Sequence, residues 1–94
     1  MALYVMKFGG SSVGDTERMQ RVARRVVDKQ QEGHQVMVVV SAMGDTTDDL
    51  IDQAKLINPD PPLREMDMLM TTGEQISIAL MAMAIDALGA KAVS

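Results

Sequence analysis

Two continuous apolar runs on either side of an amphipathic segment constrain the fold of this chain most strongly. Residues 2–8 are apolar apart from Lys7, and residues 35–41 contain the run Val36–Val40. Across residues 16–32, apolar side chains recur at three- and four-residue spacings, which predicts a helix. Strand, helix and strand within about forty residues form a crossover unit, which is almost always parallel and right-handed. We therefore predict an α/β fold with a mainly parallel sheet whose strands are buried on both faces.

The helix predicted across residues 16–32 has recognisable ends and a charged face. Asp15 or Thr16 can cap its start, and Gly33 can end it. Its apolar face contains Met19, Val22, Ala23, Val26 and Val27. Four arginines occupy the other side, and their simplest interpretation is a solvated face: Arg18, Arg21, Arg24 and Arg25.

A glycine pair follows the first predicted strand, just before the helix begins. Gly9 and Gly10 allow backbone dihedral angles that are closed to other residues and permit close approach to an anion. The helix presents unpaired N–H groups to the same place, and Lys7 adds a positive charge. The segment is therefore a candidate phosphate site. On these residues alone, a tight turn that only redirects the chain is an equal alternative.

Hydroxyl-bearing residues and a glycine follow the second predicted strand. Because both strands point the same way, Lys7–Ser11 and Ser41–Thr47 leave the sheet at the same edge, where ligands of open α/β folds bind. The hydroxyl groups and backbone donors of the second segment suit a carboxylate or a phosphate. The alternative is that Asp45, Thr46 and Thr47 only cap the next helix, which would account for one of them but hardly for all.

Two more helices are predicted on either side of a proline-rich connector at residues 58–62. The first ends near Ile57, and the second runs from Arg64 to about residue 88, with a break or a close backbone approach at Gly73. Glu74 either caps a new helix start there or holds a cationic group of a ligand. Residues 76–88 are apolar almost all round and must be enclosed, with one apolar stripe predicted at positions 76, 79, 80, 83, 84 and 87. We predict that residues 90–94 begin a third strand.

The composition excludes several classes of function. The chain has 94 residues, about one small domain, and its net charge of −4 argues against a general binder of nucleic acids or anionic membranes. The absence of cysteine excludes a disulfide framework and a thiolate metal site, and it fits a reducing cytoplasm. We interpret the ten methionines as packing in the core or a subunit interface, and we predict no metal site. The apolar stretch 76–88 is too short to span a bilayer, and no signal-peptide pattern is present.

Three motifs, taken together, resemble a known family. They are Lys7–Val13, Val38–Gly44 with Thr46–Asp48, and Thr72–Glu74 with Ser77–Leu80. In this order and spacing they resemble the opening third of the catalytic domain of the aspartokinases, which belong to the amino-acid kinase superfamily. The resemblance covers the whole chain, and Ser11 keeps the hydroxyl where many members carry threonine. It implies a three-layer α/β/α sandwich of the carbamate kinase-like type, of which this chain forms part.

The resemblance implies ATP-dependent phosphorylation of the side-chain carboxylate of L-aspartate to 4-phospho-L-aspartate, with Mg²⁺ accompanying ATP. Lys7 would be the catalytic residue that neutralises charge on the phosphates. The implied phosphate-binding group is Lys7, Phe8, Gly9, Gly10, Ser11 and Ser41. Thr47 and Glu74 would hold aspartate, with Glu74 pairing with its ammonium group, while Asp45 and Thr46 would shape the pocket. No general base is required, because the substrate carboxylate is ionised at neutral pH.

Aspartokinases are longer than this chain. They continue with a nucleotide-base pocket, further substrate and metal-associated segments and usually ACT regulatory domains. We therefore expect residues 1–94 to be an N-terminal fragment of the catalytic domain that does not turn over ATP alone. The parent enzyme would be a cytoplasmic oligomer that catalyses the first step toward lysine, threonine, methionine and diaminopimelate. Self-association through the apolar C-terminal helix is also expected.

Two alternatives stay open on the residues alone. Other kinases of the superfamily, which act on glutamate, acetylglutamate, carbamate or uridylate, share the Lys-Gly-Gly opening. Thr46–Thr47 and Thr72–Glu74 favour an amino acid with a free ammonium group over those substrates. A non-catalytic assembly module is the other alternative, because two parallel strands make a poor stand-alone sheet and an apolar helix needs cover.

Overall fold

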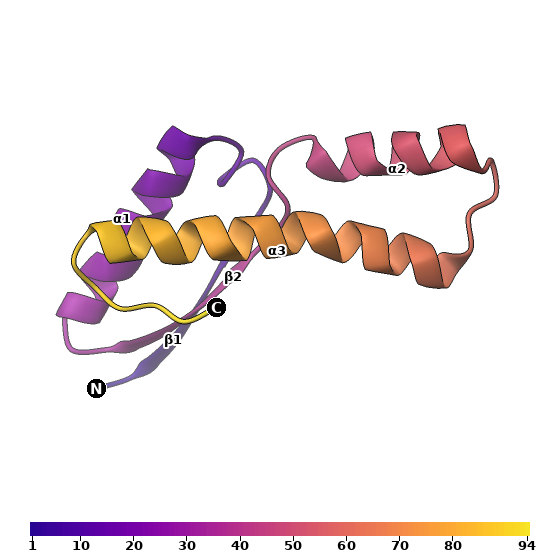
Figure 1. The fold of residues 1–94 in the computed structure, drawn as a ribbon. Helices are drawn as coiled ribbons and strands as arrows, with labels where there is room; N and C mark the ends of the chain where they lie inside the picture. Colours follow the sequence, from indigo (N-terminus) through magenta and orange to yellow (C-terminus); the bar gives the residue numbers. More distant parts are fainter.

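The computed structural model describes residues 1–94, which form two strands and three helices. The elements are β1 (Leu3–Phe8), α1 (Thr16–Gln31), β2 (Gln35–Val40), α2 (Thr46–Ile57) and α3 (Leu63–Ala87), in that order (Figure 1). β1 and β2 pair in parallel, from Leu3 opposite Gln35 to Phe8 opposite Val40. The predicted crossover unit is therefore confirmed, with α1 as the connection.

α1 takes the form that the apolar spacing predicts. The Asp15 carboxylate accepts a hydrogen bond of 2.8 Å from the backbone N–H of Arg18 and caps the helix. The buried residues of the helix are Met19, Val22, Ala23, Val26 and Val27. Gly33 follows the helix with φ of +96°, a conformation that favours glycine at a turn. Both the apolar face and the predicted ends are thus confirmed.

The helices cover one face of the sheet and leave the other exposed. Phe8 and Val40 are buried in the core with α1 and α3, and Met6, Val36 and Val38 pack against that core. The alternate side chains point the other way and form the open face of the sheet: Leu3, Val5, Lys7, Gln35, Met37 and Val39. Leu3 and Val5 are each 62% exposed. The prediction that both strands are buried on both faces is therefore wrong for these residues, because the helices cover one face only.

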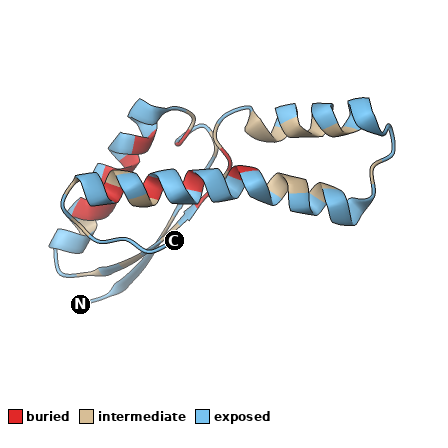
Figure 2. Ribbon diagram, viewed as in Figure 1, coloured by how far each residue is buried: buried red, intermediate tan, exposed pale blue.

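α2 and the first part of α3 form a hairpin that projects from the rest of the chain (Figure 1). α2 contains no buried residue, and Leu56, Ile57 and Leu63 near the turn are each more than 80% exposed. Figure 2 shows buried positions along α1 and along the part of α3 that crosses it, and none at the far end of the hairpin. The long dimension of the molecule, 50 Å against 24 and 17 Å, reflects this projection.

α3 is continuous through Gly73, so the predicted break is wrong and Glu74 caps no helix start. The close backbone approach is confirmed, since a Cβ at Gly73 would lie 3.0 Å from the Ala42 Cβ and 3.3 Å from the Thr46 Cγ2. The buried positions of α3 are Gly73, Ser77, Met81 and Ile85. The predicted stripe is the wrong one, because Ile76 and Met83 are 51% and 66% exposed.

The outer side of α3 remains uncovered within these residues, and residues 90–94 form no strand. By length and composition alone, Leu63–Ala87 is long enough and apolar enough to cross a membrane. The apolar stretch 76–88, predicted to be too short to span a bilayer, belongs to a longer helix that begins at Leu63. Core helices of soluble proteins pass the same test, so this property alone assigns no membrane role.

Candidate functional site

The two strand exits meet at the carboxyl edge of the sheet. The backbone N–H of Ser41 donates a 3.2 Å hydrogen bond to the Phe8 carbonyl, and the N–H of Gly44 donates a 3.1 Å bond to the Gly10 carbonyl. These bonds join the segment after β1 to the segment after β2. The predicted meeting of Lys7–Ser11 with Ser41–Thr47 is thus present in the geometry.

Gly10 is required by close packing between these two segments. A Cβ at position 10 would lie 2.9 Å from the Ala42 carbonyl oxygen, closer than real Cβ atoms come. Gly9 has open space where a Cβ would point, and its carbonyl accepts a 3.0 Å hydrogen bond from the Ser12 N–H. Neither glycine has a positive φ, whereas Gly44 has φ of +48°. The expectation that Gly9 and Gly10 adopt backbone dihedral angles closed to other residues is therefore wrong. Gly44 has the positive φ in this region instead.

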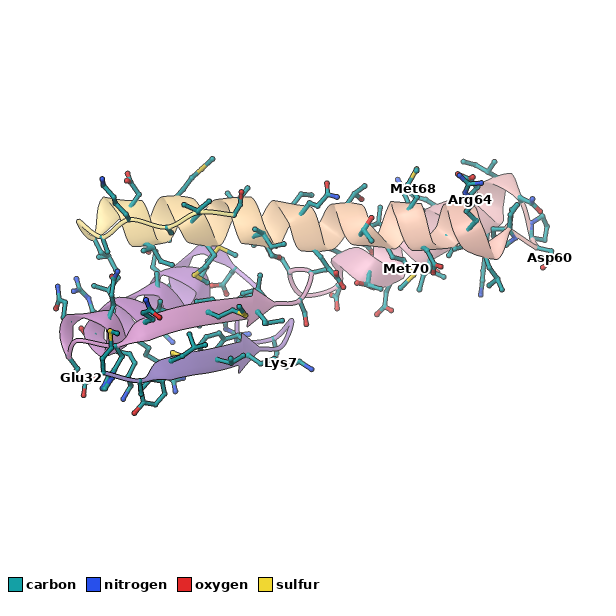
Figure 3. All side chains as sticks on the ribbon, turned by 90° about the horizontal axis from the view of Figure 1, so that it is seen from below. Lys7, Glu32, Asp60, Arg64, Met68 and Met70 are labelled. Atoms are coloured by element: carbon teal, nitrogen blue, oxygen red, sulfur yellow. The ribbon has the colours of Figure 1, made fainter.

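Lys7 extends away from the helices, beyond the carboxyl end of β1 (Figure 3). Its side chain is exposed, and it takes part in none of the ion pairs of the chain. Gly9 beside it is exposed, and Gly10 and Ser41 are half-buried. An unpaired ammonium group therefore stands next to accessible backbone, an arrangement that suits a bound anion.

The candidate substrate residues lie where α2 begins and where α3 passes it. Asp45 precedes α2 but makes no side-chain capping hydrogen bond, while the Thr46 N–H donates a 2.9 Å bond to the Met43 carbonyl. The carboxylate of Asp45 is therefore available, and the capping alternative does not explain it. Asp45 is exposed, and Thr46 and Thr47 are half-buried.

Glu74 directly follows Gly73, the residue of α3 that packs against Ala42 and Thr46. Its side chain is exposed and takes part in no ion pair. No hydrogen bond or ion pair joins Glu74 to Lys7–Ser11. Residues 41–46 therefore connect the two parts of the candidate site. They are hydrogen-bonded to the segment after β1 and packed against Gly73 of α3. No group of three or more His, Cys, Asp or Glu side chains in the chain could hold a metal ion.

Comparison with known proteins identifies the family. The family model described as the amino acid kinase family matches residues 2–94. The chain belongs to the amino acid kinase family. Its relatives include the aspartokinase of Mycolicibacterium smegmatis, 64% identical over 94 residues, which are all of this chain and 22% of that protein. The aspartokinase of Thermus thermophilus is 57% identical over 89 residues, 95% of this chain and 22% of that protein.

The fold of this amino acid kinase chain also matches a solved structure. The crystal structure of aspartate kinase from Synechocystis superposes with a TM-score of 0.95 at 53% identity, covering 97% of this chain and 16% of that one. The α/β architecture is therefore that of the matching part of an aspartate kinase. The chain spans about a fifth of the length of the curated relatives it matches.

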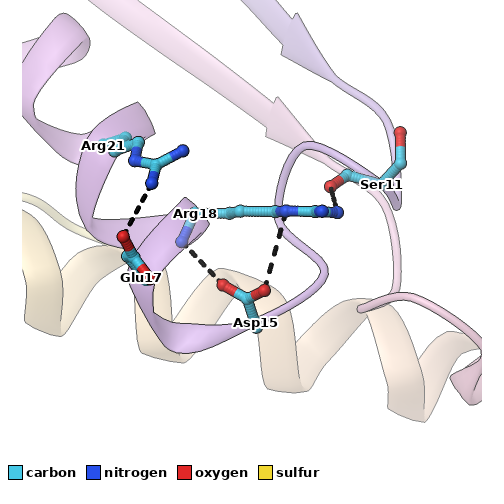
Figure 4. A network of polar contacts seen from close by, with 5 residues as sticks. All are labelled: Ser11, Asp15, Glu17, Arg18 and Arg21. Atoms are coloured by element: carbon cyan, nitrogen blue, oxygen red, sulfur yellow. Dashed lines mark hydrogen bonds and ion pairs between the residues drawn. The ribbon is translucent and has the colours of Figure 1, made fainter.

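Arg18, which the sequence did not single out as a site residue, contacts the glycine-rich segment of this family member. Arg18 donates a 3.0 Å hydrogen bond from Nη1 to the Ser11 carbonyl, and its Nε lies 3.6 Å from the Asp15 carboxylate (Figure 4). It thereby ties the segment after β1 to the first turn of α1. The available signal was the spacing of Asp15 and Arg18, three residues apart at the helix start.

Proposed function

We propose that this chain is the N-terminal part of an aspartokinase catalytic domain, which phosphorylates the side-chain carboxylate of L-aspartate with ATP. The observation that carries the proposal is the high identity to aspartokinases along the whole chain, 64% for the relative from M. smegmatis. The meeting of the two strand exits supports it, because phosphoryl transfer depends on alignment and charge neutralisation more than on covalent chemistry by the protein.

In this proposal the segment after β1 holds the phosphates. Lys7 neutralises charge on the transferred group, and the segment Phe8–Ser11 donates hydrogen bonds from its backbone and from the Ser11 hydroxyl. Ser41 lies beside the same group, because its N–H is bonded to the Phe8 carbonyl. The open space at Gly9 leaves room for a phosphate oxygen next to the main chain.

Aspartate is bound on the other side of residues 41–46. Glu74 pairs with the substrate ammonium group, and Thr47 bonds to the substrate from the start of α2. Asp45 and Thr46 shape the pocket. The side-chain carboxylate of aspartate is already ionised at neutral pH, so it attacks the γ-phosphorus without a general base, and ADP leaves.

Mg²⁺ enters with ATP as part of the substrate. The described residues form no carboxylate cluster that would bind this ion by themselves, and we assign no step to it. In the proposal, the rest of the enzyme supplies the nucleotide-base pocket, and residues 1–94 do not turn over ATP alone. The reaction would be the first step toward lysine, threonine, methionine and diaminopimelate, in the cytoplasm. The exposed outer side of α3, with Ile76, Leu80 and Met83, would pack in an oligomer.

Substitutions in the intact enzyme test this assignment. Glu74→Gln should raise the KM for aspartate about tenfold or more with little change in the KM for ATP, because one charged partner of the ammonium group is lost. Lys7→Met should lower kcat roughly 100-fold through lost stabilisation of phosphoryl charge. Glu65→Gln, an exposed change in the first turn of α3, is the matched control and should alter neither constant.

Calorimetric titration of the same enzyme with aspartate, glutamate and UMP completes the test. Aspartate should bind tightest, and Glu74→Gln should weaken that binding selectively. Tighter binding of glutamate or UMP, or an unchanged aspartate affinity in Glu74→Gln, would contradict the proposal.

A further inference from the structure

An open hollow of about 400 Å³ lies between the glycine-rich segment and α1. Its lining is almost entirely polar and includes three arginines. The lining residues are Ser11, Ser12, Arg18, Arg21, Val22 and Arg25. All four arginines are exposed, as the predicted solvated face requires. Three of them line this hollow together with Ser11 and Ser12, while Arg24 stays outside it.

The helix geometry explains the convergence. Arg18, Arg21 and Arg25 are spaced by three and four residues, so they share one side of α1. The Arg18 guanidinium is held by Asp15 and by the Ser11 carbonyl (Figure 4). The Arg25 guanidinium carbon lies 5.6 Å from the centroid of the Phe8 ring. Contact with the ring leaves the N–H groups of Arg25 available in the plane of the guanidinium.

Two carboxylates compete with an anion for this site. Asp15 lies 3.6 Å from Arg18 Nε, and Glu17 accepts a 2.6 Å bond from Arg21 Nη2. Arg25 has no carboxylate partner. Three positive charges thus face two negative ones, and the five donors of each arginine exceed what the two carboxylates use. The remaining charge and donors match a tetrahedral oxyanion, which arginine binds in a bidentate manner.

We propose that this hollow binds a phosphate group, free or as the monoester of a small metabolite, at a site separate from Lys7. The separation follows from the fold, because Lys7 extends from the open face of the sheet whereas α1 lies on the covered face. The bound anion is held by Arg21 and Arg25, with the Ser12 hydroxyl as a further donor. The site does not depend on the proposed kinase reaction.

Calorimetry of the intact protein carrying Lys7→Ala tests the site, with inorganic phosphate and glycerol 3-phosphate as probes. Saturable binding is expected in this background. Adding Arg21→Ala or Arg25→Ala should weaken it about tenfold or more, since each removes a charge-assisted pair. Arg24→Ala, a neighbouring arginine outside the hollow, is the matched control and should change the affinity by less than about twofold. Tighter binding of one probe identifies the source of the phosphate.

A gain of affinity provides the opposite test. Glu17→Gln frees the Arg21 guanidinium from its carboxylate partner and should strengthen phosphate binding several-fold. The side chains of Arg21 and Glu17 are 70% and 76% exposed, so the fold should be retained, which circular dichroism checks. Absence of saturable binding in the Lys7→Ala background, or an equal loss in Arg24→Ala and Arg21→Ala, would overturn the proposal.

Discussion

The crossover unit and the projecting hairpin of this chain differ in how they are held. Every buried residue lies either between Phe8 and Ala42 or from Gly73 onward, and none lies in the hairpin between them. The segment after β1 contains the fully buried Val13, whereas the start of α2 contacts Gly73 through Thr46. Because local stability follows burial, we expect the crossover unit to be the more stable region and the hairpin the less stable one.

The largest expected effect compares two methionines on the same helix. Met81 is 3% exposed and packs on the crossover unit, whereas Met68 in the hairpin is 63% exposed. Met81→Ala should lower the free energy of unfolding by about 2–5 kcal/mol, because it leaves a cavity in the core. Met68→Ala should change it by about 0.5 kcal/mol at most. Urea denaturation followed by circular dichroism measures both, and equal losses would break the comparison between the regions.

A smaller loss of stability is expected where the segment after β1 meets the segment after β2. Gly10→Ala places a Cβ 2.9 Å from the Ala42 carbonyl oxygen, so one segment must shift, at a cost of about 1–3 kcal/mol. Gly9→Ala meets no atom within 4 Å and serves as the matched control. The same denaturation experiment compares the two variants. A Gly10→Ala protein as stable as Gly9→Ala would show that the junction is not tightly packed.

The smallest effect compares the starts of α1 and α2. Asp15 accepts a hydrogen bond from the Arg18 N–H, so Asp15→Ala should cost about 1 kcal/mol. Asp45 makes no such bond, so Asp45→Ala should leave stability nearly unchanged. Thermal unfolding of the two variants measures the difference. If Asp45→Ala proved the more costly change, the start of α2 would be held by contacts beyond its junction with Gly73.

The crossover unit was predictable because its signals are local. Apolar spacing, a capping aspartate and Gly33 together define α1, and the parallel direction of the strands then places Lys7 and Ser41 at one edge. The hydrogen bond from Ser41 to Phe8 agrees with that reasoning. The site roles of Lys7 and Glu74 remain predictions.

The course and burial of α3 were not predictable from local patterns. Gly73 costs about 1 kcal/mol in a helix, yet its missing side chain permits the contact with Ala42 and Thr46. Tertiary packing therefore favours a continuous helix. Since α3 is apolar nearly all round, the sequence could not distinguish the buried side with Met81 from the exposed side with Met83. The need for glycine at position 10 was likewise invisible, because it arises from a segment 32 residues away.

The register of the two strands has a consequence for how the site tolerates change. β1 and β2 are six residues each and pair without a bulge, ending with Phe8 opposite Val40. Since side chains alternate, inserting or deleting one residue in β2 would turn its valines to the opposite face and displace Ser41 from the Phe8 carbonyl. Substitutions in the strands alter packing, whereas a change in strand length separates the segment after β1 from the segment after β2. The relative placement of Lys7 and Ser41 thus depends on the number of residues in each strand as well as on which residues they are.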